Sequence, residues 1–282
     1  MKRIAFVLGA LAIIPAALFL TGCRDEEEAA DARYAAEIAG VIEIGGSTSV
    51  VPVLELLAND FHDANPNVRI NIHSTGSSDG IRNAGGLYQF GMTSRELTPA
   101  ELGMGLTERL IAIDGIAVIV NSQSPVRDLT LEQIRGIYTG TITDWSQVSG
   151  DKSGAIAVVT REEGSGTRGA FEEMVGFPGM LRSGAVEGPS TGAVRSNVAG
   201  NVNAIGYISV GSVDGSVRAI AVGGVEPTAA NMAAGLYGIA RPFILLYRDL
   251  DPASTAFIDW VTSDGQSIVA RGWQTIPGWM PQ

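Results

Sequence analysis

Three loops of this sequence combine glycine with serine and threonine in a pattern suited to binding an anion. They read GGSTS at 45–49, TGSSDG at 75–80 and GSGT at 164–167, and each precedes a helix-like segment. Such a loop presents unpaired backbone N–H groups, hydroxyl donors and the positive end of a helix dipole, and its glycines allow a bound group to approach closely. A single loop of this kind is more often a plain helix cap and turn, but three converging loops would surround a small tetrahedral oxyanion.

Arg161 adds a positive charge beside the third loop. It lies four residues before Ser165, at the predicted end of a strand. Its guanidinium could therefore give two parallel, charge-assisted hydrogen bonds to an anion at the following helix start. Glu162 or Glu163 could fix its orientation. The alternative is a surface ion pair among these residues and Arg168, and the sequence leaves both interpretations open.

The third loop also matches a motif of another protein class. GSGTRG at 164–169 fits the dinucleotide fingerprint G-x-G-x-x-G, which requires an acidic residue about twenty positions later on a following strand. Glu187 stands near that position, but the residues around it lack the apolar strand that would position it. A dinucleotide site is therefore not expected.

The second loop raises a hydrolase as an alternative. GSSDG at 76–80 fits G-x-S-x-G, the nucleophile motif of a fold whose catalytic histidine follows the serine. Both histidines of the chain, His62 and His73, precede it. A lipid-anchored hydrolase would have to depend on Ser78 or His73. Two histidines, one cysteine and unclustered carboxylates also argue against a metal site, so we expect no enzyme activity, no cofactor and no metal.

The net charge argues against nucleic acid as a partner. The chain has 19 basic and 30 acidic residues, a formal net charge of −11. Removal of residues 1–22, which include Lys2 and Arg3, would leave 17 basic and 30 acidic residues, or −13. A body of this charge repels phosphate backbones at long range. Any bound anion must therefore be held by local donors.

The first 23 residues have the layout of an export signal. A basic start at 1–3 precedes 17 uncharged, apolar residues at 4–20. LTGC at 20–23 resembles the bacterial lipobox, so we expect Cys23 to carry the lipid of an extracytoplasmic protein at the cell surface or in the periplasm. The alternative is a retained membrane anchor, but 17 residues interrupted by Pro15 are short for a spanning helix. Cys23 is the only cysteine, so no intrachain disulfide can form.

From residue 40 onward, strand-like apolar runs alternate with amphipathic helix-like segments. Strands are predicted at 41–46, 67–74, 110–121, 155–160, 204–213, 218–222 and 238–248, with a short strand and loop at 88–97. Helices are predicted at 49–61, from about 81, in the segment 129–145 with Thr130 as its cap, and at 169–177 and 255–271. This alternation predicts an α/β fold with parallel strands and helices on both faces of the sheet. The runs 110–121 and 238–248 are long enough to cross between two lobes, and a cleft between lobes is a common ligand site.

The predicted domain organisation follows from these two crossings. We expect a signal peptide at 1–22, an acidic tether at 23–39, a first lobe at 40–116 and 239–282, and a second lobe inserted at 117–238. The tether is charged and Ala-rich, with little to pack against. The 260 residues that remain after signal removal are enough for two domains of ordinary size.

Beyond the separate motifs, a series of segments over residues 45–273 resembles one known family. In chain order they are GGSTSVVPVLELLANDFHDANP, TGSSDGIRNA, FGMTSREL, DGIAVIVN, LTLEQIRGIYTGTITDW, REEGSGTRGAF, NAIGYISV and DGQSIVARGW. Together they resemble the phosphate-binding lipoproteins of bacterial ABC-type phosphate importers. The resemblance implies a monomeric, two-lobed periplasmic-binding-protein fold of type II with two crossing strands. It also implies inorganic phosphate bound in the cleft without a metal, and permease transmembrane subunits as partners.

The resemblance also assigns site residues by position. The implied phosphate ligands lie in the three glycine-rich loops and just before the third: Thr48, Ser49, Ser77, Arg161, Ser165, Gly166 and Thr167. Glu163 matches an acidic position that holds the arginine.

One position departs from the family pattern. Many members carry an aspartate in the loop that reads FGMTSREL here, and it accepts the proton of hydrogen phosphate and helps to reject sulfate. The matching residue is Ser94, which can accept a hydrogen bond but carries no charge. Members with SREL-type loops exist, so phosphate is the expected ligand, and Asp79 is a candidate for the acceptor role. The alternatives are a receptor for sulfate, molybdate or tungstate, and a phosphate sensor without transport.

Overall fold

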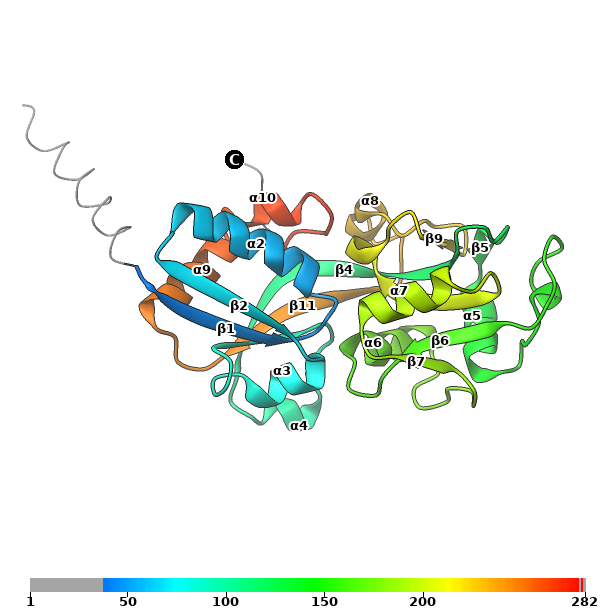
Figure 1. Cartoon of the computed structure of the whole chain (residues 1–282), viewed down its shortest axis with the longest axis horizontal. Coiled ribbons are helices and arrows are strands. Elements are labelled where there is room, and N and C mark those ends of the chain that lie inside the picture. The colour runs from blue at the N-terminus through cyan, green and yellow to red at the C-terminus, as the bar shows by residue number, and fades with distance from the viewer. Residues whose placement is uncertain (1–37, 279, 281–282) are drawn as a thin grey trace, which may run out of the picture. The chain divides into compact units, whose positions relative to one another are not determined.

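The computed structural model of the chain describes residues 38–278 and residue 280 (Figure 1). The predicted signal peptide, Cys23 and most of the acidic tether lie outside the described residues. Within the described part, none of the helices has the length and apolar character needed to cross a membrane. The same part holds no group of three or more His, Cys, Asp or Glu residues placed to bind a metal ion.

A nine-stranded sheet runs through the described residues in the order β2-β1-β3-β11-β4-β8-β6-β7, with β9 also paired to β4. Its strands are β1 (Gly40–Gly46), β2 (Val68–Ser74), β3 (Phe90–Thr93), β4 (Thr107–Asn121), β6 (Ala157–Arg161), β7 (Val186–Gly188), β8 (Ala204–Ser209), β9 (Val217–Ala219) and β11 (Ala240–Tyr247). A two-stranded sheet joins β5 (Asp128–Leu129) to β10 (Ala221–Val222). The mixed α/β class is thus confirmed.

β4 and β11 connect two lobes (Figure 1). β4 pairs antiparallel with β11 from Thr107 to Gly115, and then with β8 from Ile116 to Val120. The first lobe contains β1, β2 and β3, and the second contains β6, β7 and β8. The prediction of a two-lobed fold with two crossing strands is therefore confirmed, while the exact lobe boundaries at 116/117 and 238/239 stay predictions.

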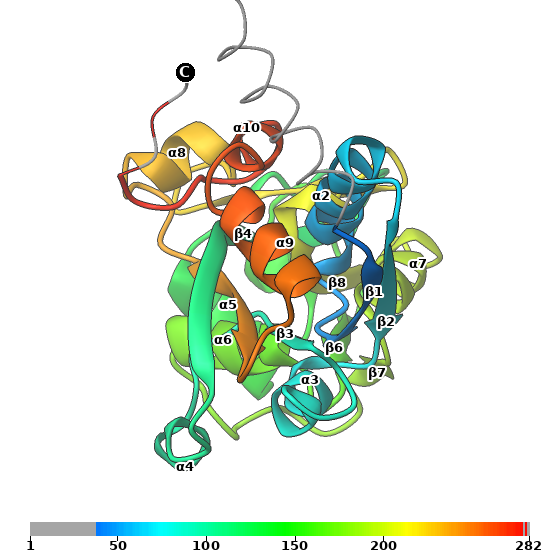
Figure 2. The same ribbon diagram turned by 90° about the vertical axis from the view of Figure 1, so that its left-hand side faces the viewer.

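Helices cover both faces of the first lobe's sheet, with α2 (Val51–Ala64) and α9 (Pro252–Val261) on one side and α3 (Ser77–Asn83) on the other (Figure 1, Figure 2). The other helices are α4 (Pro99–Leu102), α5 (Leu131–Thr139), α6 (Gly166–Val175), α7 (Thr191–Ala199), α8 (Ala229–Ala233) and α10 (Gln266–Val269), with 3₁₀ turns at Trp145–Gln147 and Val210–Ser212.

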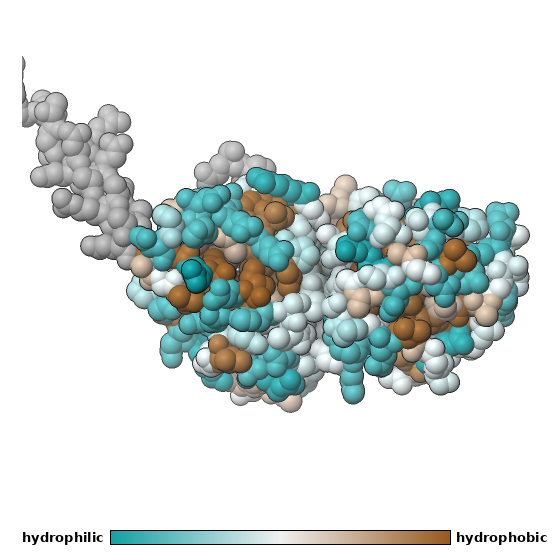
Figure 3. All heavy atoms as spheres, viewed as in Figure 1, coloured by the Kyte–Doolittle hydropathy of each residue, from teal (hydrophilic) through white to brown (hydrophobic). Residues whose placement is uncertain are grey.

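The second lobe has an apolar core on each face of its sheet, which requires strands that are apolar throughout. In β4 the side chains alternate between the two cores. Ile116, Val118 and Val120 lie in one cluster of buried side chains, and Ala117 and Ile119 lie in another. Both faces of this stretch are therefore fixed by packing. The face of the molecule shown in Figure 3 is largely polar, with apolar side chains in separate patches.

Some predicted element boundaries were wrong for local reasons. The helix predicted at 129–145 ends at Thr139, because Gly140 adopts the left-handed conformation that terminates a helix. The helix predicted at 255–271 is two helices and begins earlier, because Asp251 caps α9 by accepting a hydrogen bond from the backbone of Ser254. The stretch that forms β7 and α7 had no predicted element.

Candidate anion-binding site

Seven hydroxyl side chains from both lobes gather where the strand ends and helix starts meet. We call them the hydroxyl cluster: Ser47, Thr48, Ser49, Ser77, Ser94, Thr167 and Thr191. Each has less than a tenth of its surface exposed. Buried hydroxyls require hydrogen-bond partners, and here they find these mainly in one another.

The cluster joins the lobes directly. Ser49 Oγ lies 2.7 Å from Thr167 Oγ1 and 3.0 Å from Thr191 Oγ1. Thr48 Oγ1 lies 3.0 Å from Thr191 Oγ1 and accepts a hydrogen bond of 3.2 Å from the Thr191 amide. Thr48 and Ser49 follow β1 of the first lobe, whereas Thr167 and Thr191 begin α6 and α7 of the second. Residues about 120–140 positions apart in sequence thus meet through their hydroxyl groups.

The first lobe completes its half of the cluster with Ser47 after β1, Ser77 at the start of α3 and Ser94 after β3. Ser47 Oγ donates to Ser94 Oγ at 2.8 Å, and Ser77 Oγ lies 3.4 Å from Ser94 Oγ. The Ser94 amide donates to Ser77 Oγ at 3.2 Å. The structure therefore brings the predicted Ser77 and Ser94 together and adds Ser47, which the sequence analysis did not single out.

Gly166 lies where no side chain could fit. A β-carbon there would lie 2.4 Å from Ser77 Oγ and 2.9 Å from Ser94 Oγ, so the glycine permits close contact between α6 and the first lobe. Ser165, just before it, is buried and caps α6 by accepting from the Arg168 amide. The positive end of the α6 dipole therefore points at the cluster.

Arg161 lies at the end of β6 with only 2% of its side chain exposed. Its Nε and Nη2 donate to Glu162 Oε2 and Oε1 at 2.8 and 2.7 Å, and its Nη1 reaches Thr191 Oγ1 at 3.3 Å. The carboxylate that holds the arginine is thus Glu162, and the prediction that Glu163 would do so was wrong. Glu163 is exposed, because the chain turns toward solvent after β6 and only the first glutamate lies along the guanidinium.

Asp79 is not placed to accept a proton from a ligand in the cluster. Its carboxylate accepts hydrogen bonds from Asn83 Nδ2 at 2.9 Å and from the Tyr88 hydroxyl at 3.3 Å. It also pairs with Arg82 at 3.6 Å. Two positions along a helix correspond to a turn of roughly 200°, so the buried Ser77 and the partly exposed Asp79 face different sides of α3. The hypothesis for Asp79 was therefore wrong.

A second buried arginine reaches the cluster from a crossing strand. Arg241 in β11 donates through Nη1 to Ser94 Oγ at 3.3 Å and to the Ser94 carbonyl at 3.4 Å. Its Nε and Nη2 donate to Asp114 Oδ2 in β4, at 3.2 and 3.0 Å, and Asp114 Oδ1 accepts from Ser209 Oγ at 2.7 Å. Both side chains of the ion pair are 0% exposed. Burial raises the pKa of Asp114 to about 6 and lowers that of Arg241.

The sequence contained signals for the residues that were missed. Asp114 and Arg241 are single charges of opposite sign in two otherwise apolar runs, LIAIDGIAVIV and GIARPFILLY. A buried charge requires a partner of opposite sign. The lone aspartate in one run and the lone arginine in the other therefore indicated that the two side chains pair. Thr191 lies in GPSTGA, a fourth loop that repeats the design of the three recognised ones.

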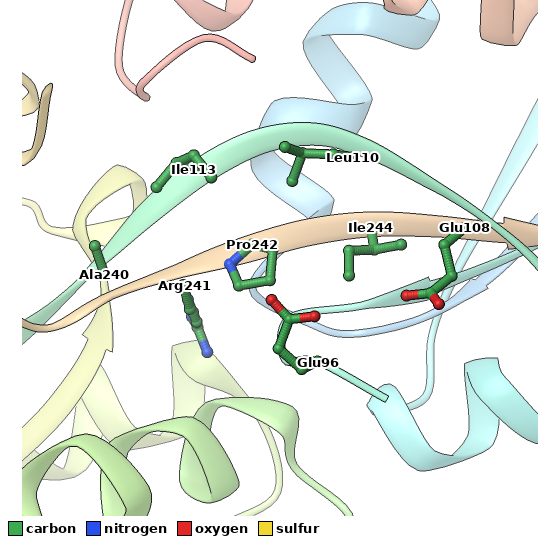
Figure 4. Close-up of a pocket in the computed structure, with 8 residues that line it drawn as sticks. All are labelled: Glu96, Glu108, Leu110, Ile113, Ala240, Arg241, Pro242 and Ile244. Carbon is green, nitrogen blue, oxygen red and sulfur yellow. The ribbon is translucent and has the colours of Figure 1, made fainter. Parts of the chain in front are cut away.

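A pocket of about 380 Å³ lies beside the crossing strands and is not suited to an anion. Its walls include Leu110, Pro242 and Ile244, with the carboxylates of Glu96 and Glu108 beside them (Figure 4). Arg241 also lines this pocket, but its Nε and Nη2 are paired with Asp114. Two exposed carboxylates repel a second negative charge. The hydroxyl cluster, with two guanidinium groups at its edge, is the better candidate.

Comparison with known proteins shows the family to which this chain belongs. Residues 28–265 match the family model described as the PBP superfamily domain. The phosphate-binding protein PstS of Borreliella burgdorferi is 28% identical over 244 residues, which cover 81% of this chain and 87% of that protein.

Solved structures agree. A crystal structure with bound phosphate, of a Clostridium perfringens protein assigned as a phosphate ABC transporter substrate-binding protein, is 45% identical with a TM-score of 0.82, covering 84% of this chain and all of that one. An ABC-type phosphate transport receptor from Vibrio cholerae is 36% identical with a TM-score of 0.69, covering 83% of this chain and all of that one. This chain belongs to the PBP superfamily.

Proposed function

We propose that this chain is the extracytoplasmic solute-binding protein of an ABC-type importer and that it captures inorganic phosphate at the hydroxyl cluster. The observation that carries the proposal is the cluster itself, in which buried hydroxyls of both lobes lie beside the Nη1 groups of Arg161 and Arg241. The similarity to a Clostridium perfringens protein solved with bound phosphate supports the choice of anion.

The donors of the cluster match the chemistry of a small oxyanion. On binding, the hydroxyls of Ser49, Thr167 and Thr191 would exchange their mutual hydrogen bonds for bonds to phosphate oxygens. The starts of α6 and α7 add backbone N–H groups and dipole charge, and Arg161 Nη1 adds a charge-assisted bond. Such local donors let a chain of net charge −11 hold an anion.

Transport would depend on movement of the two lobes relative to each other. Hydrogen bonds across the cluster stabilise the lobes in contact, and bending of β4 and β11 would separate them, as in hinge motions of other two-lobed binding proteins. The form closed on phosphate would then dock on the transmembrane subunits of the permease. We propose that the chain acts as a monomer, anchored through a lipid on Cys23.

The surroundings of the histidines support a binding role over a catalytic one. His73 Nε2 pairs with Glu43 at 2.6 Å, and His62 Nδ1 is hydrogen-bonded to the Val68 carbonyl at 2.8 Å. Neither interaction activates a serine. The alternative hydrolase, which required Ser78 or His73, is therefore not supported, because the hydrogen-bond partners of His62 and His73 are the Val68 carbonyl and Glu43 rather than a serine.

Titration calorimetry of the mature protein with phosphate, sulfate and molybdate tests the proposal. We expect tight phosphate binding without turnover of phosphate esters. Arg161→Ala should weaken phosphate binding about 100-fold or more, because it removes a buried charge that faces the ligand. Arg82→Ala is the matched control, since Arg82 lies on α3 with 67% of its side chain exposed. The proposal fails if phosphate gives neither heat nor thermal stabilisation, or if molybdate binds more tightly.

A further inference from the structure

Thr191 begins α7 in the second lobe and makes hydrogen bonds to the segment after β1 in the first lobe. Its Oγ1 lies 3.0 Å from both Thr48 Oγ1 and Ser49 Oγ, and its amide donates to Thr48 Oγ1 at 3.2 Å. The helix does not depend on this hydroxyl as a cap, because Ser190 Oγ accepts from the Ala193 amide at 3.1 Å. The Thr191 hydroxyl therefore serves contacts outside its own helix.

The same hydroxyl also contacts Arg161, which belongs to the second lobe. Arg161 Nη1 lies 3.3 Å from Thr191 Oγ1, and because an arginine can only donate, this oxygen is the acceptor. The other two guanidinium nitrogens with printed partners are bound to Glu162. Thr191 is 5% exposed, so this single buried oxygen joins the guanidinium of one lobe to two hydroxyls of the other.

These contacts respond differently to a movement of the lobes. Thr191 and Arg161 lie in the second lobe and would move together when β4 and β11 bend, so their bond can persist. Thr48 and Ser49 would move with the first lobe, so their bonds to Thr191 exist only while the lobes are in contact. The hydroxyl of Thr191 thus adds stability to the closed form alone.

A second contact between the lobes has a different character. The Ser78 amide donates to the Gly164 carbonyl at 3.2 Å, and no change of side chain removes a bond between two backbone groups. The bonds of Thr191 Oγ1, in contrast, disappear when its hydroxyl is replaced by a methyl group. The lobes would keep the backbone contact, so the contribution of Thr191 can be measured in a protein that still closes.

We propose that Thr191 is a positioning residue of the phosphate site, which stabilises the closed form through Thr48 and Ser49 and holds Arg161 Nη1 against the first lobe. This inference rests on the proposed function and deepens it, because it assigns a residue that determines how long phosphate is retained. Retention matters for a carrier that must keep its ligand until it reaches the permease.

The principal test is Thr191→Val, which keeps the shape of the side chain and removes the hydroxyl. Release of radiolabelled phosphate from the mature protein is followed after addition of excess unlabelled phosphate. We expect release to be about tenfold faster than in the wild type, because hydrogen bonds of the closed form are lost. The association rate constant, obtained from release and the calorimetric dissociation constant, should stay within about twofold. Thr191→Ser retains the hydroxyl and should restore slow release.

A double-mutant cycle tests whether Thr191 acts through Thr48. Thr48→Val alone should also speed release, because it removes the partner hydroxyl. In the combined variant the acceleration should be clearly smaller than the product of the two single effects, since the second substitution removes a bond that the first has already broken. Two residues that each contacted phosphate independently would give effects that multiply.

Ser190→Ala is the matched control at the neighbouring position. It removes the cap of α7 and should lower the melting temperature, while it leaves the Thr191 hydroxyl in place. We expect its release rate to equal that of the wild type. The control therefore separates weakening of α7 from loss of the contacts between the lobes.

Four results would overturn the inference. They are release from Thr191→Val at the wild-type rate, a loss of affinity that appears in association instead of release, failure of Thr191→Ser to restore retention, and single effects at Thr48 and Thr191 that multiply. Each would leave the proposed function standing, because the wild-type chain would still bind phosphate. A wild-type chain that does not bind phosphate would overturn the proposed function and this inference together.

Discussion

Arg161 and Arg241 both contact the hydroxyl cluster through Nη1, but they differ in the carboxylate that binds their other guanidinium nitrogens. In both, Nη1 reaches a hydroxyl, that of Thr191 for Arg161 and that of Ser94 for Arg241. Arg161 pairs with its sequence neighbour Glu162, whose side chain is 31% exposed. Arg241 pairs with Asp114, which lies 127 residues away and is 0% exposed. One pair is partly solvated and the other is dry.

This difference separates a ligand-facing pair from a structural one. Water reaching Glu162 lowers the cost of keeping that ion pair charged, so it can adjust when a ligand arrives. The pair in the crossing strands is fully buried, and this burial raises the pKa of Asp114. Such a pair is strongly destabilising to break and contributes little when intact. It fixes geometry more than it adds stability.

The largest expected effect comes from breaking the dry pair. Asp114→Ala should lower the free energy of unfolding by about 3–5 kcal/mol, because it leaves the Arg241 charge buried and uncompensated. Urea unfolding followed by circular dichroism measures this. Asp114→Leu with Arg241→Met should restore most of the loss. A single variant as stable as the wild type would show that the pair is not dry in solution.

The pH dependence of the free energy of unfolding reports on the same carboxylate, that of Asp114. The pKa of Asp114 is raised from 3.8 to about 6 in the folded chain, so the folded state holds this proton more tightly than the unfolded state. Asp114 therefore favours folding below about pH 4, and the advantage is lost as pH rises to about 6. The change amounts to about 3 kcal/mol. The wild-type curve minus that of Asp114→Asn should show this decline, and a flat difference would contradict it.

A third pair, Arg95 with Glu101, has intermediate exposure and lies beside Ser94. The side chains are 17% and 20% exposed and joined at 2.7 Å. The hydrogen bond from Arg95 lowers the pKa of Glu101 to about 2, so its contribution is present above about pH 4.5 and is lost as pH falls toward 2. We expect Glu101→Gln to cost about 1–2 kcal/mol at neutral pH, after allowance for solvent screening.

The contribution of Glu101 to the free energy of unfolding rises with pH, whereas that of Asp114 falls with pH. Urea unfolding between pH 2 and 5 should show the difference between wild type and Glu101→Gln shrinking toward acid. Glu96→Gln, an exposed neighbour on the same loop, serves as the control. A difference that persists unchanged at pH 2 would mean that the capping geometry of Glu101, rather than its charge, provides the stability.

The smallest effect is expected at the solvated pair. Glu162→Gln should change the free energy of unfolding by about 1 kcal/mol or less, because the carboxylate is partly exposed and glutamine can still accept one hydrogen bond. Glu163→Gln, at the next position, should be within about 0.5 kcal/mol of the wild type. The melting temperatures of the two variants, measured by thermal unfolding, show which glutamate contributes more to stability. A larger effect at Glu163 would restore the original assignment of the arginine's partner.

The parts of the fold and site that are encoded locally could be predicted from the sequence. The glycine and hydroxyl segments determine their own conformation, and Gly164 and Ser165 lead into α6, whose first residues are Gly166 and Thr167. The crossing strands were evident because their apolar runs exceed an ordinary strand. Glu162 could not be chosen over Glu163, because the direction of the chain after β6 depends on packing rather than on spacing.

Contacts that depend on the tertiary arrangement could not be predicted from spacing. Asp114 and Arg241 face each other only because β4 and β11 pair in one register. The hydrogen bonds of Ser94 could not be predicted either, because its neighbours Ser47 and Arg241 come from distant parts of the chain. Residue type gave the possible hydrogen bonds, but the direction of each bond came from its surroundings.

The alternation of β4 side chains between two cores has a consequence for how this protein can change during evolution. One residue inserted after Gly115 would move Ile116, Val118 and Val120 out of one core and into the other. The same insertion between the exposed residues 150 and 151 would be absorbed by the surface. The length of β4 should therefore be inherited unchanged while surface loops vary. Because β4 pairs with strands of both lobes, a change in its length would disturb the packing of both lobes at once.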